Sequence, residues 1–182
     1  IDGMTSVRDL RMRVGALPRF PSNMLRYNLT WSTEGLINEY CQPCEVVMNG
    51  KLKSVQPLEN LEAIVVDGVE YEAFNTSGGL GTLATTLMGK VRNVSYKSIR
   101  YPGHNLFIRF LYNELKMNQD RDTLKTIFER SLPGTSQDVV VIYVSAVGKQ
   151  DGYYVERTYA KAIQHQVLHG QPWSAIQITT AA

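Results

Sequence analysis

The sequence predicts an α+β domain with a largely antiparallel or mixed sheet and helices on one face. Asn49-Gly50 and Asp67-Gly68 each separate two short β-type runs, and type I′ hairpin turns require such dipeptides. The helical patterns come in one block, over residues 103–115 and 121–132, instead of alternating with every strand. This order favours antiparallel pairing, because parallel neighbours need a crossover between them.

Residue patterns, together with turn and cap residues, predict where each element begins and ends. Apolar and charged side chains alternate over residues 7–14, which predicts a half-exposed strand that ends at Gly15 and Pro18. Ser32 or Thr33 is expected to cap a short helix that runs through Tyr40. The further strands are expected at 45–48, 51–55, 63–66, 69–74, 91–99, 138–147 and 153–159, and further helices at 79–88, at 121–132 after an Asp120 cap, and from Pro172 onward.

Composition limits the classes of protein to consider. The 182 residues fit a single domain, and 43% hydrophobic with 20% charged residues is ordinary for a globular chain. A net charge of +2 argues against nucleic acid as a partner. No apolar run approaches the ~20 residues of a membrane span, and no secretory signal is visible. We therefore expect a cytoplasmic protein that binds neither nucleic acid nor membrane.

The ends of the sequence suggest a piece of a longer protein. Ile1 is not an initiator Met, and the chain stops at Ala182 without a polar tail or a helix stop. We therefore expect residues 1–182 to form one domain of a longer enzyme.

The pair Cys41 and Cys44 has the spacing of a redox motif or of half a zinc site. The three histidines lie far along the chain, and no βαβ pattern surrounds the pair. Small buried thiols near a helix end are the favoured interpretation, and no metal site is expected.

The run Gly79-Leu80-Gly81-Thr82-Leu83-Ala84 fits the dinucleotide pattern G-x-G-x-x-A between a strand and a helix. Three observations argue against a dinucleotide site. The preceding strand is a hairpin arm that carries Glu70 and Glu72 and is therefore not a buried parallel strand, and the predicted helix is short for a connection between parallel strands. No acidic residue follows the next strand at the ribose position. Anion binding by the backbone amides at the helix start stays an alternative for this loop, because it needs only the first turn of a helix.

We call a predicted strand-to-helix turn that carries polar side chains a polar corner. Residues 75–79 form the first polar corner, and Arg100 and His104 form the second. Arg100 is a candidate carboxylate clamp, or else a surface arginine. His104 could bind a carboxylate or assist proton transfer, or else cap its own helix. Thr76 and Ser77 could donate to a carboxylate or cap a helix that starts at Gly79. The two corners together predict an anion pocket.

Several runs in this order resemble the C-terminal domain of the saccharopine dehydrogenase family, bacterial type. They are Val14-Gly15-Ala16-Leu17-Pro18, Leu29-Thr30-Trp31-Ser32-Thr33-Glu34-Gly35-Leu36-Ile37, the stretches around Thr76 and Arg100, Asp120-Arg121-Asp122-Thr123-Leu124-Lys125, and Trp173 to Ala181. The resemblance implies a fold similar to the C-terminal domain of glyceraldehyde-3-phosphate dehydrogenase. It also implies a substrate-binding and dimerisation domain whose Rossmann domain is absent from this chain.

The resemblance further implies an oxidoreductase of lysine metabolism that uses NAD or NADP. Family members oxidise saccharopine to an imine, which hydrolyses to glutamate and 2-aminoadipate semialdehyde, and relatives act on lysine or carboxylated polyamines. The expected partners are an amino-acid substrate, the missing Rossmann domain and a second copy of the chain. The isolated chain is expected to bind no cofactor and to be inactive.

In fungal relatives, the motif matched by Trp31 and Ser32 contacts substrate, and the loop matched by residues 75–78 supplies an arginine. This chain has no arginine there, so the resemblance implies a lysine-like substrate in place of saccharopine unless Arg100 replaces the missing arginine. Trp31 is expected to be largely buried, either as a pocket wall or in the core. The expected substrate-binding set is Trp31, Ser32, Asn75, Thr76, Ser77, Gly78, Gly79, Arg100 and His104.

Two alternatives from other classes stay open at this point. One is a self-contained anion- or nucleotide-binding module that uses the Gly78 to Gly81 loop. The other is a non-catalytic interaction domain in which both polar corners are ordinary helix caps.

Overall fold

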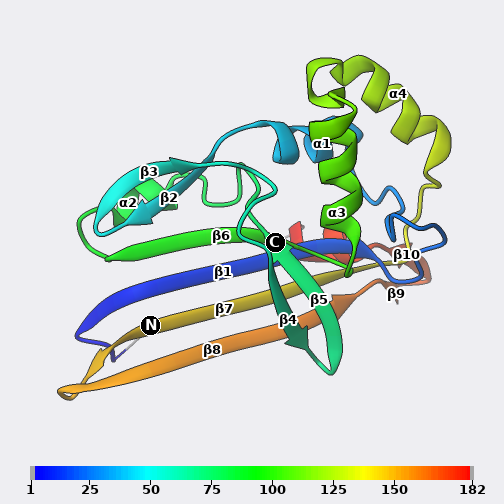
Figure 1. Ribbon diagram of the computed structural model, residues 1–182. Helices are drawn as coiled ribbons and strands as arrows, with labels where there is room; N and C mark the ends of the chain where they lie inside the picture. The colour runs from blue at the N-terminus through cyan, green and yellow to red at the C-terminus, as the bar shows by residue number, and fades with distance from the viewer. Residues whose placement is uncertain (1–2, 181–182) are drawn as a thin grey trace.

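An eight-stranded mixed sheet forms the body of the protein in the computed structural model, which describes residues 3–180 (Figure 1). Six strands follow one path in the order β3-β2-β6-β1-β7-β8, and the β4-β5 hairpin joins the sheet through β6. The pair β1 and β6 is parallel, whereas the hairpins and the pair β1 and β7 are antiparallel. The predicted α+β class with a largely antiparallel or mixed sheet is confirmed.

The elements follow one another as strands joined by tight turns, with helices between. Asn49 and Asp67 have the left-handed φ angles of 52° and 50° that type I′ turns need, so the two predicted hairpins are confirmed, and Asp151, in the turn from β7 to β8, has a similar φ of 51°. The strands are β1 (Ser6–Pro18), β2 (Cys44–Met48), β3 (Lys51–Val55), β4 (Glu62–Val66), β5 (Val69–Phe74), β6 (Asn93–Arg100), β7 (Asp138–Gln150), β8 (Tyr153–Gln164), β9 (Gln166–Leu168) and β10 (Gln171–Trp173). The helices are α1 (Thr33–Cys41), α2 (Leu83–Leu87), α3 (His104–Arg109), which continues as a π-helical turn (Phe110–Glu114), α4 (Arg121–Ser131) and α5 (Ala175–Thr180).

Two predicted caps have their expected geometry. Ser32 accepts a hydrogen bond from the Gly35 amide at the start of α1, and Asp120 accepts one from the Thr123 amide at the start of α4. Each cap satisfies one of the amide groups that a helix start leaves without an internal partner.

The predicted helix over 79–88 is wrong in its first turn. Gly78 and Gly81 both have positive φ, so the chain from Gly78 to Thr82 forms turns, and α2 covers only Leu83–Leu87. The predicted helix from Pro172 onward is also corrected, because residues 171–173 form β10 and the helix α5 starts at Ala175.

Of the two predicted stops of the first strand, Pro18 is confirmed and Gly15 is wrong, because β1 continues to Pro18. Gly15 lies beside Ile99 of the neighbouring parallel strand β6, and a Cβ atom there would sit 2.4 Å from the Ile99 carbonyl oxygen. The missing side chain therefore permits close packing at this point and does not end the strand.

We expect Gly15→Ala to destabilise the fold by about 1–3 kcal/mol, because the new methyl group meets the backbone of Ile99. Gly134→Ala is the matched control, since the nearest atom to its new Cβ would be the Leu29 oxygen at 3.9 Å. Urea unfolding of both variants measures the difference. Equal stability of the two variants would contradict the close-packing argument.

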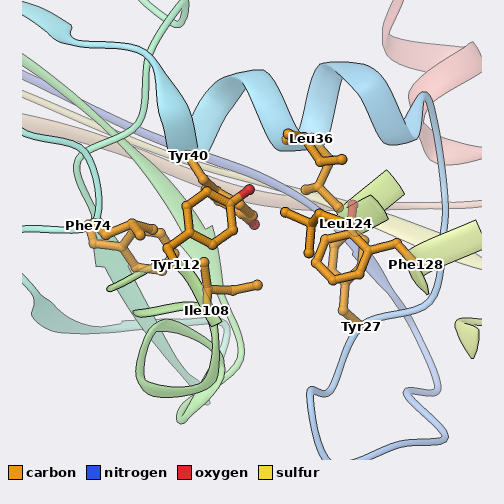
Figure 2. Close-up of a cluster of buried hydrophobic side chains, with 10 residues drawn as sticks. Tyr27, Leu36, Tyr40, Phe74, Ile108, Tyr112, Leu124 and Phe128 are labelled. Atoms are coloured by element: carbon orange, nitrogen blue, oxygen red, sulfur yellow. The ribbon is translucent and has the colours of Figure 1, made fainter. Parts of the chain in front are cut away.

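Three clusters of buried side chains form the core. The largest lies beneath α1, α3 and α4 and contains Tyr27, Leu36, Tyr40, Phe74, Ile108, Tyr112, Leu124 and Phe128 (Figure 2). The second covers the sheet face that includes Leu10 and Val94, next to α2. The third lies on the opposite face, under the β4-β5 hairpin, and includes Leu17, Tyr71 and Ile99.

Most of the helices lie together instead of being spread over the sheet. Figure 1 shows α1, α3 and α4 gathered near one end of the strands, with α2 beside the β2-β3 hairpin toward the other end. Within residues 3–180, no helix combines the length and the apolar character that crossing a membrane requires.

Candidate functional site

The loop that follows β5 borders a hollow of about 350 Å³ between the β2-β3 hairpin and β6. Its size is at the lower end of the range for small-molecule pockets. Thr76, Gly78 and Gly79, all in the predicted substrate-binding set, contribute to its wall. The other lining residues are Pro43, Glu45, Ser54, Leu80, Gly81 and Tyr96. We call this hollow the loop pocket.

Polar groups of the loop form hydrogen bonds to α1 and to the segment between β3 and β4. Ser77 donates from its amide to the Glu39 carbonyl at 3.0 Å and from its hydroxyl to the Asn38 carbonyl at 3.0 Å. It therefore caps the C-terminal end of α1, which corrects the prediction that it caps a helix at Gly79. The buried Asn75 side chain donates to the Gln56 carbonyl at 3.1 Å.

Gly79 holds the loop close to the Tyr96 ring. A Cβ atom on Gly79 would lie 2.1 Å from that ring, so only glycine permits this packing. Burial raises the pKa of Tyr96 to about 12, which keeps its hydroxyl protonated at neutral pH. The wall formed by Gly79 and Tyr96 is thus neutral.

Arg100 is buried behind the loop pocket, with only 2% of its surface exposed. Its Nε donates to the Tyr40 hydroxyl at 2.9 Å, Nη2 to the Glu39 carboxylate at 2.8 Å, and Nη1 to the Ile99 carbonyl at 2.8 Å. Burial acts to lower the pKa of Arg100, but Tyr40 and Glu39 outweigh it, so the pKa is raised and the group stays charged. All three guanidinium nitrogens thus donate within the chain.

His104 continues this network on the far side of Tyr40. Its Nδ1 lies 3.0 Å from the Leu25 carbonyl, which can only accept, so Nδ1 carries the proton. Nε2 then accepts from the Tyr40 hydroxyl at 2.9 Å, and that hydroxyl oxygen accepts from Arg100. Burial and the nearby Arg100 charge lower the pKa of His104 to about 3, so the ring is neutral at pH 7.

A second branch of the network connects Arg100 to the loop pocket through Glu39. Burial raises the pKa of Glu39, although Arg100 and Ser98 oppose this effect, and Glu39 Oε2 accepts from the Arg100 guanidinium at 2.8 Å. The Ser98 hydroxyl donates to Glu39 at 3.4 Å and lies 2.7 Å from the Thr76 hydroxyl. Thr76 is the member of this branch that lines the pocket.

The amides at the start of α3 already have an anionic partner. Glu72, from β5, accepts from the Gly103 amide at 2.9 Å and from the Asn105 amide at 2.6 Å. Both contacts are charge-assisted hydrogen bonds at a helix N-terminus. The anion that the sequence pattern predicts at this corner is therefore a carboxylate of the chain itself.

Trp31 and Ser32 lie at the other end of α1 from Glu39. The prediction that Trp31 is largely buried is wrong, since 36% of its surface is exposed. Its Nε1 donates to the Tyr27 hydroxyl at 3.1 Å, and its ring packs where a Gly35 side chain would be. Ser32 is the exposed N-cap of α1.

The structure thus brings part of the predicted set together. Thr76, Gly78 and Gly79 line the loop pocket, while Arg100 and His104 lie in one buried network behind it. Sequence reasoning missed Glu39, Tyr40, Tyr96 and Ser98. The period-two alternation of β6 could have identified two of them, because Tyr96 and Ser98 share a strand face with Arg100.

The glycine loop does not fit a dinucleotide. Its flanking strands β5 and β6 pair antiparallel, whereas the fingerprint needs parallel strands around a crossover helix. The helix α2 has only five residues. In the described residues 3–180, no group of three or more His, Cys, Asp or Glu side chains is placed to hold a metal ion.

The family model described as the saccharopine dehydrogenase C-terminal domain matches residues 1–181. This chain belongs to that family. Its fold is similar to that of the apo histidine-tagged saccharopine dehydrogenase (L-Glu forming) from Saccharomyces cerevisiae, with a TM-score of 0.72 at 15% sequence identity. The match covers 96% of this chain and 56% of the yeast chain, so this saccharopine dehydrogenase C-terminal domain spans little more than half of that protein.

Proposed function

We propose that this domain forms the substrate side of an NAD- or NADP-dependent oxidoreductase that oxidises the C–N bond of an amino acid, saccharopine or a lysine-type compound. Family membership over residues 1–181 is the observation that carries the proposal. The loop pocket supports it, because it joins a small-molecule-sized hollow to an ordered hydrogen-bond network. The domain binds and orients the amino acid, and the Rossmann domain of the longer enzyme holds the nicotinamide cofactor.

A stand-alone nucleotide-binding module is less well supported, since the glycine loop lacks the parallel strands and the crossover helix. A non-catalytic interaction domain would leave the loop pocket without a role. We expect the isolated chain to reduce neither NAD nor NADP, because hydride transfer requires a cofactor held against the substrate.

The longer enzyme that contains this domain provides the test. Gly79→Ala should raise the Michaelis constant for the amino acid roughly tenfold or more, because its Cβ would displace Tyr96 or the loop. The Michaelis constant for NAD(P) should change little. Gly134→Ala serves as the control, and reduced nicotinamide absorbance measures the rate. Absence of NAD(P) reduction with saccharopine and with lysine would refute the proposed function.

We also propose that two copies of the domain pair through the partly exposed β1-β7-β8 portion of the sheet face, beside the second core cluster. Met12 on β1 pairs with Val144 on β7, and Val144 pairs with Tyr159 on β8, so their side chains share one face. Tyr159 is 55% exposed, and Met12 and Val144 are half-buried. Apolar surface on a sheet face is typical of an interface between subunits.

Light scattering should therefore give a dimer mass for the wild type and a monomer mass for Tyr159→Glu, because a buried unpaired carboxylate is costly. Tyr153→Glu, at the hairpin end of β8, should remain dimeric. A monomeric wild type at high concentration would refute the interface.

A further inference from the structure

The loop pocket carries one formal charge in its lining, and that charge is negative. Among its described lining residues Glu45 is the only acidic one, and no arginine or lysine lines it. Glu45 lies on β2 directly opposite Ser54 on β3, and both are exposed. Arg100 does not compensate this charge, because its guanidinium is buried and bound to Glu39. An anionic ligand would therefore find no cation there.

The directions of the hydrogen bonds behind the pocket also disfavour an anionic ligand. Arg100 can only donate, so Glu39 Oε2 accepts from it, and the same oxygen accepts from the Ser98 hydroxyl. Ser98 has a single hydroxyl proton, which is committed to Glu39, so its oxygen must accept from the Thr76 hydroxyl 2.7 Å away. Thr76 thereby uses its only hydroxyl proton inside the network, and its oxygen retains lone pairs but no donor.

Tyr96 contributes no charge to the wall, because burial raises its pKa to about 12 and keeps its hydroxyl protonated at neutral pH. The polar side chains of the wall are then the Glu45 carboxylate, the Thr76 oxygen and the Ser54 and Tyr96 hydroxyls, with no cation among the described lining residues.

We propose that the loop pocket binds the primary ammonium group of an aliphatic amine, with the Thr76 Oγ1 accepting one N–H bond and the Glu45 carboxylate balancing the charge. An ammonium group has three donors and no acceptor, which complements this wall. The inference rests on the proposed function and specifies which end of the amino acid this domain recognises. It also reverses the polarity of the anion pocket predicted from the sequence.

Titration of the whole 182-residue chain with n-butylammonium chloride and with sodium butyrate tests the inference. At neutral pH and constant ionic strength, butylammonium should shift the amide NMR signals of Gly78, Gly79 and Gly81 saturably, whereas butyrate should not. Saturable butyrate binding at these amides, or no saturable shift with butylammonium, would overturn it.

Single substitutions distinguish the contribution of the hydrogen-bond acceptor to butylammonium affinity from the contribution of the pocket's shape. Thr76→Val keeps the side-chain volume and removes the acceptor, so butylammonium affinity should fall roughly fivefold or more, while Thr76→Ser should retain it. Glu45→Gln should weaken binding by a similar factor, and Glu156→Gln, exposed on the remote β8, should leave it unchanged. Unchanged affinity in Thr76→Val would also overturn the inference.

The two proposals fail in different ways. Loss of amine binding here with NAD(P) reduction intact in the longer enzyme would refute the ammonium site and leave the proposed function standing. Butylammonium binding without any NAD(P) reduction would support the site and refute the proposed function.

Discussion

Arg100→Met is expected to cost about 3–5 kcal/mol of folding free energy, because it leaves the Glu39 carboxylate without its cationic partner in a buried network. The loss extends beyond one ion pair, since the Tyr40 hydroxyl and the Ile99 carbonyl also lose a donor. Arg100→Lys should recover only part of it, because an ammonium cannot reproduce the planar fork. Denaturant unfolding at neutral pH measures these differences.

A double variant tests whether the unpaired charge causes the loss. Arg100→Met combined with Glu39→Met should be more stable than Arg100→Met alone, because it removes both charges together. The control is Lys125→Met, in a pair with Glu34 at 3.6 Å where both side chains are exposed, and it should cost no more than about 1 kcal/mol. Equal losses for the Arg100 and Lys125 variants would refute a buried network.

The turns and caps of the fold were predictable from the sequence because their causes are local. Asn49-Gly50 and Asp67-Gly68 encode their own φ angles, and Asp120 caps the helix that directly follows it. The path of β1 through Gly15 was not predictable in this way. It depends on Ile99, more than eighty residues later, whose backbone fills the space of a side chain.

The candidate site was predictable as a location but not in its polarity. The glycine loop and Arg100 were identified from residue type and from their place at strand ends. The partners of Arg100 were not, because Glu39 and Tyr40 lie about sixty residues earlier and only tertiary packing brings them together. A positive charge read from sequence suggested an anion pocket. The folded chain pairs that charge with Glu39 in its interior, and Glu45 is the only acidic or basic side chain among the described residues that line the hollow.

Histidine burial also predicts that this domain loses stability in mild acid. The pKa of His104 falls from an ordinary 6.5 to about 3 in the folded state, so the unfolded chain binds the proton first as the pH falls. The stabilising contribution is complete above pH 6.5 and is lost progressively between pH 6.5 and about pH 3. Between pH 6.5 and about pH 4.5 this single group should cost roughly 2–3 kcal/mol.

Comparison with His104→Gln isolates that effect from carboxylate titration. Glutamine can still donate to the Leu25 carbonyl and accept from Tyr40, but it has no proton to gain, so the variant should lose less stability over the same pH interval. His169→Gln, at an exposed position, should follow the wild type. Urea unfolding across the interval measures all three proteins, and imidazole NMR should show His104 still neutral at about pH 5. Parallel pH profiles for wild type and His104→Gln would mean that the ring is not held neutral by burial and by the Arg100 charge.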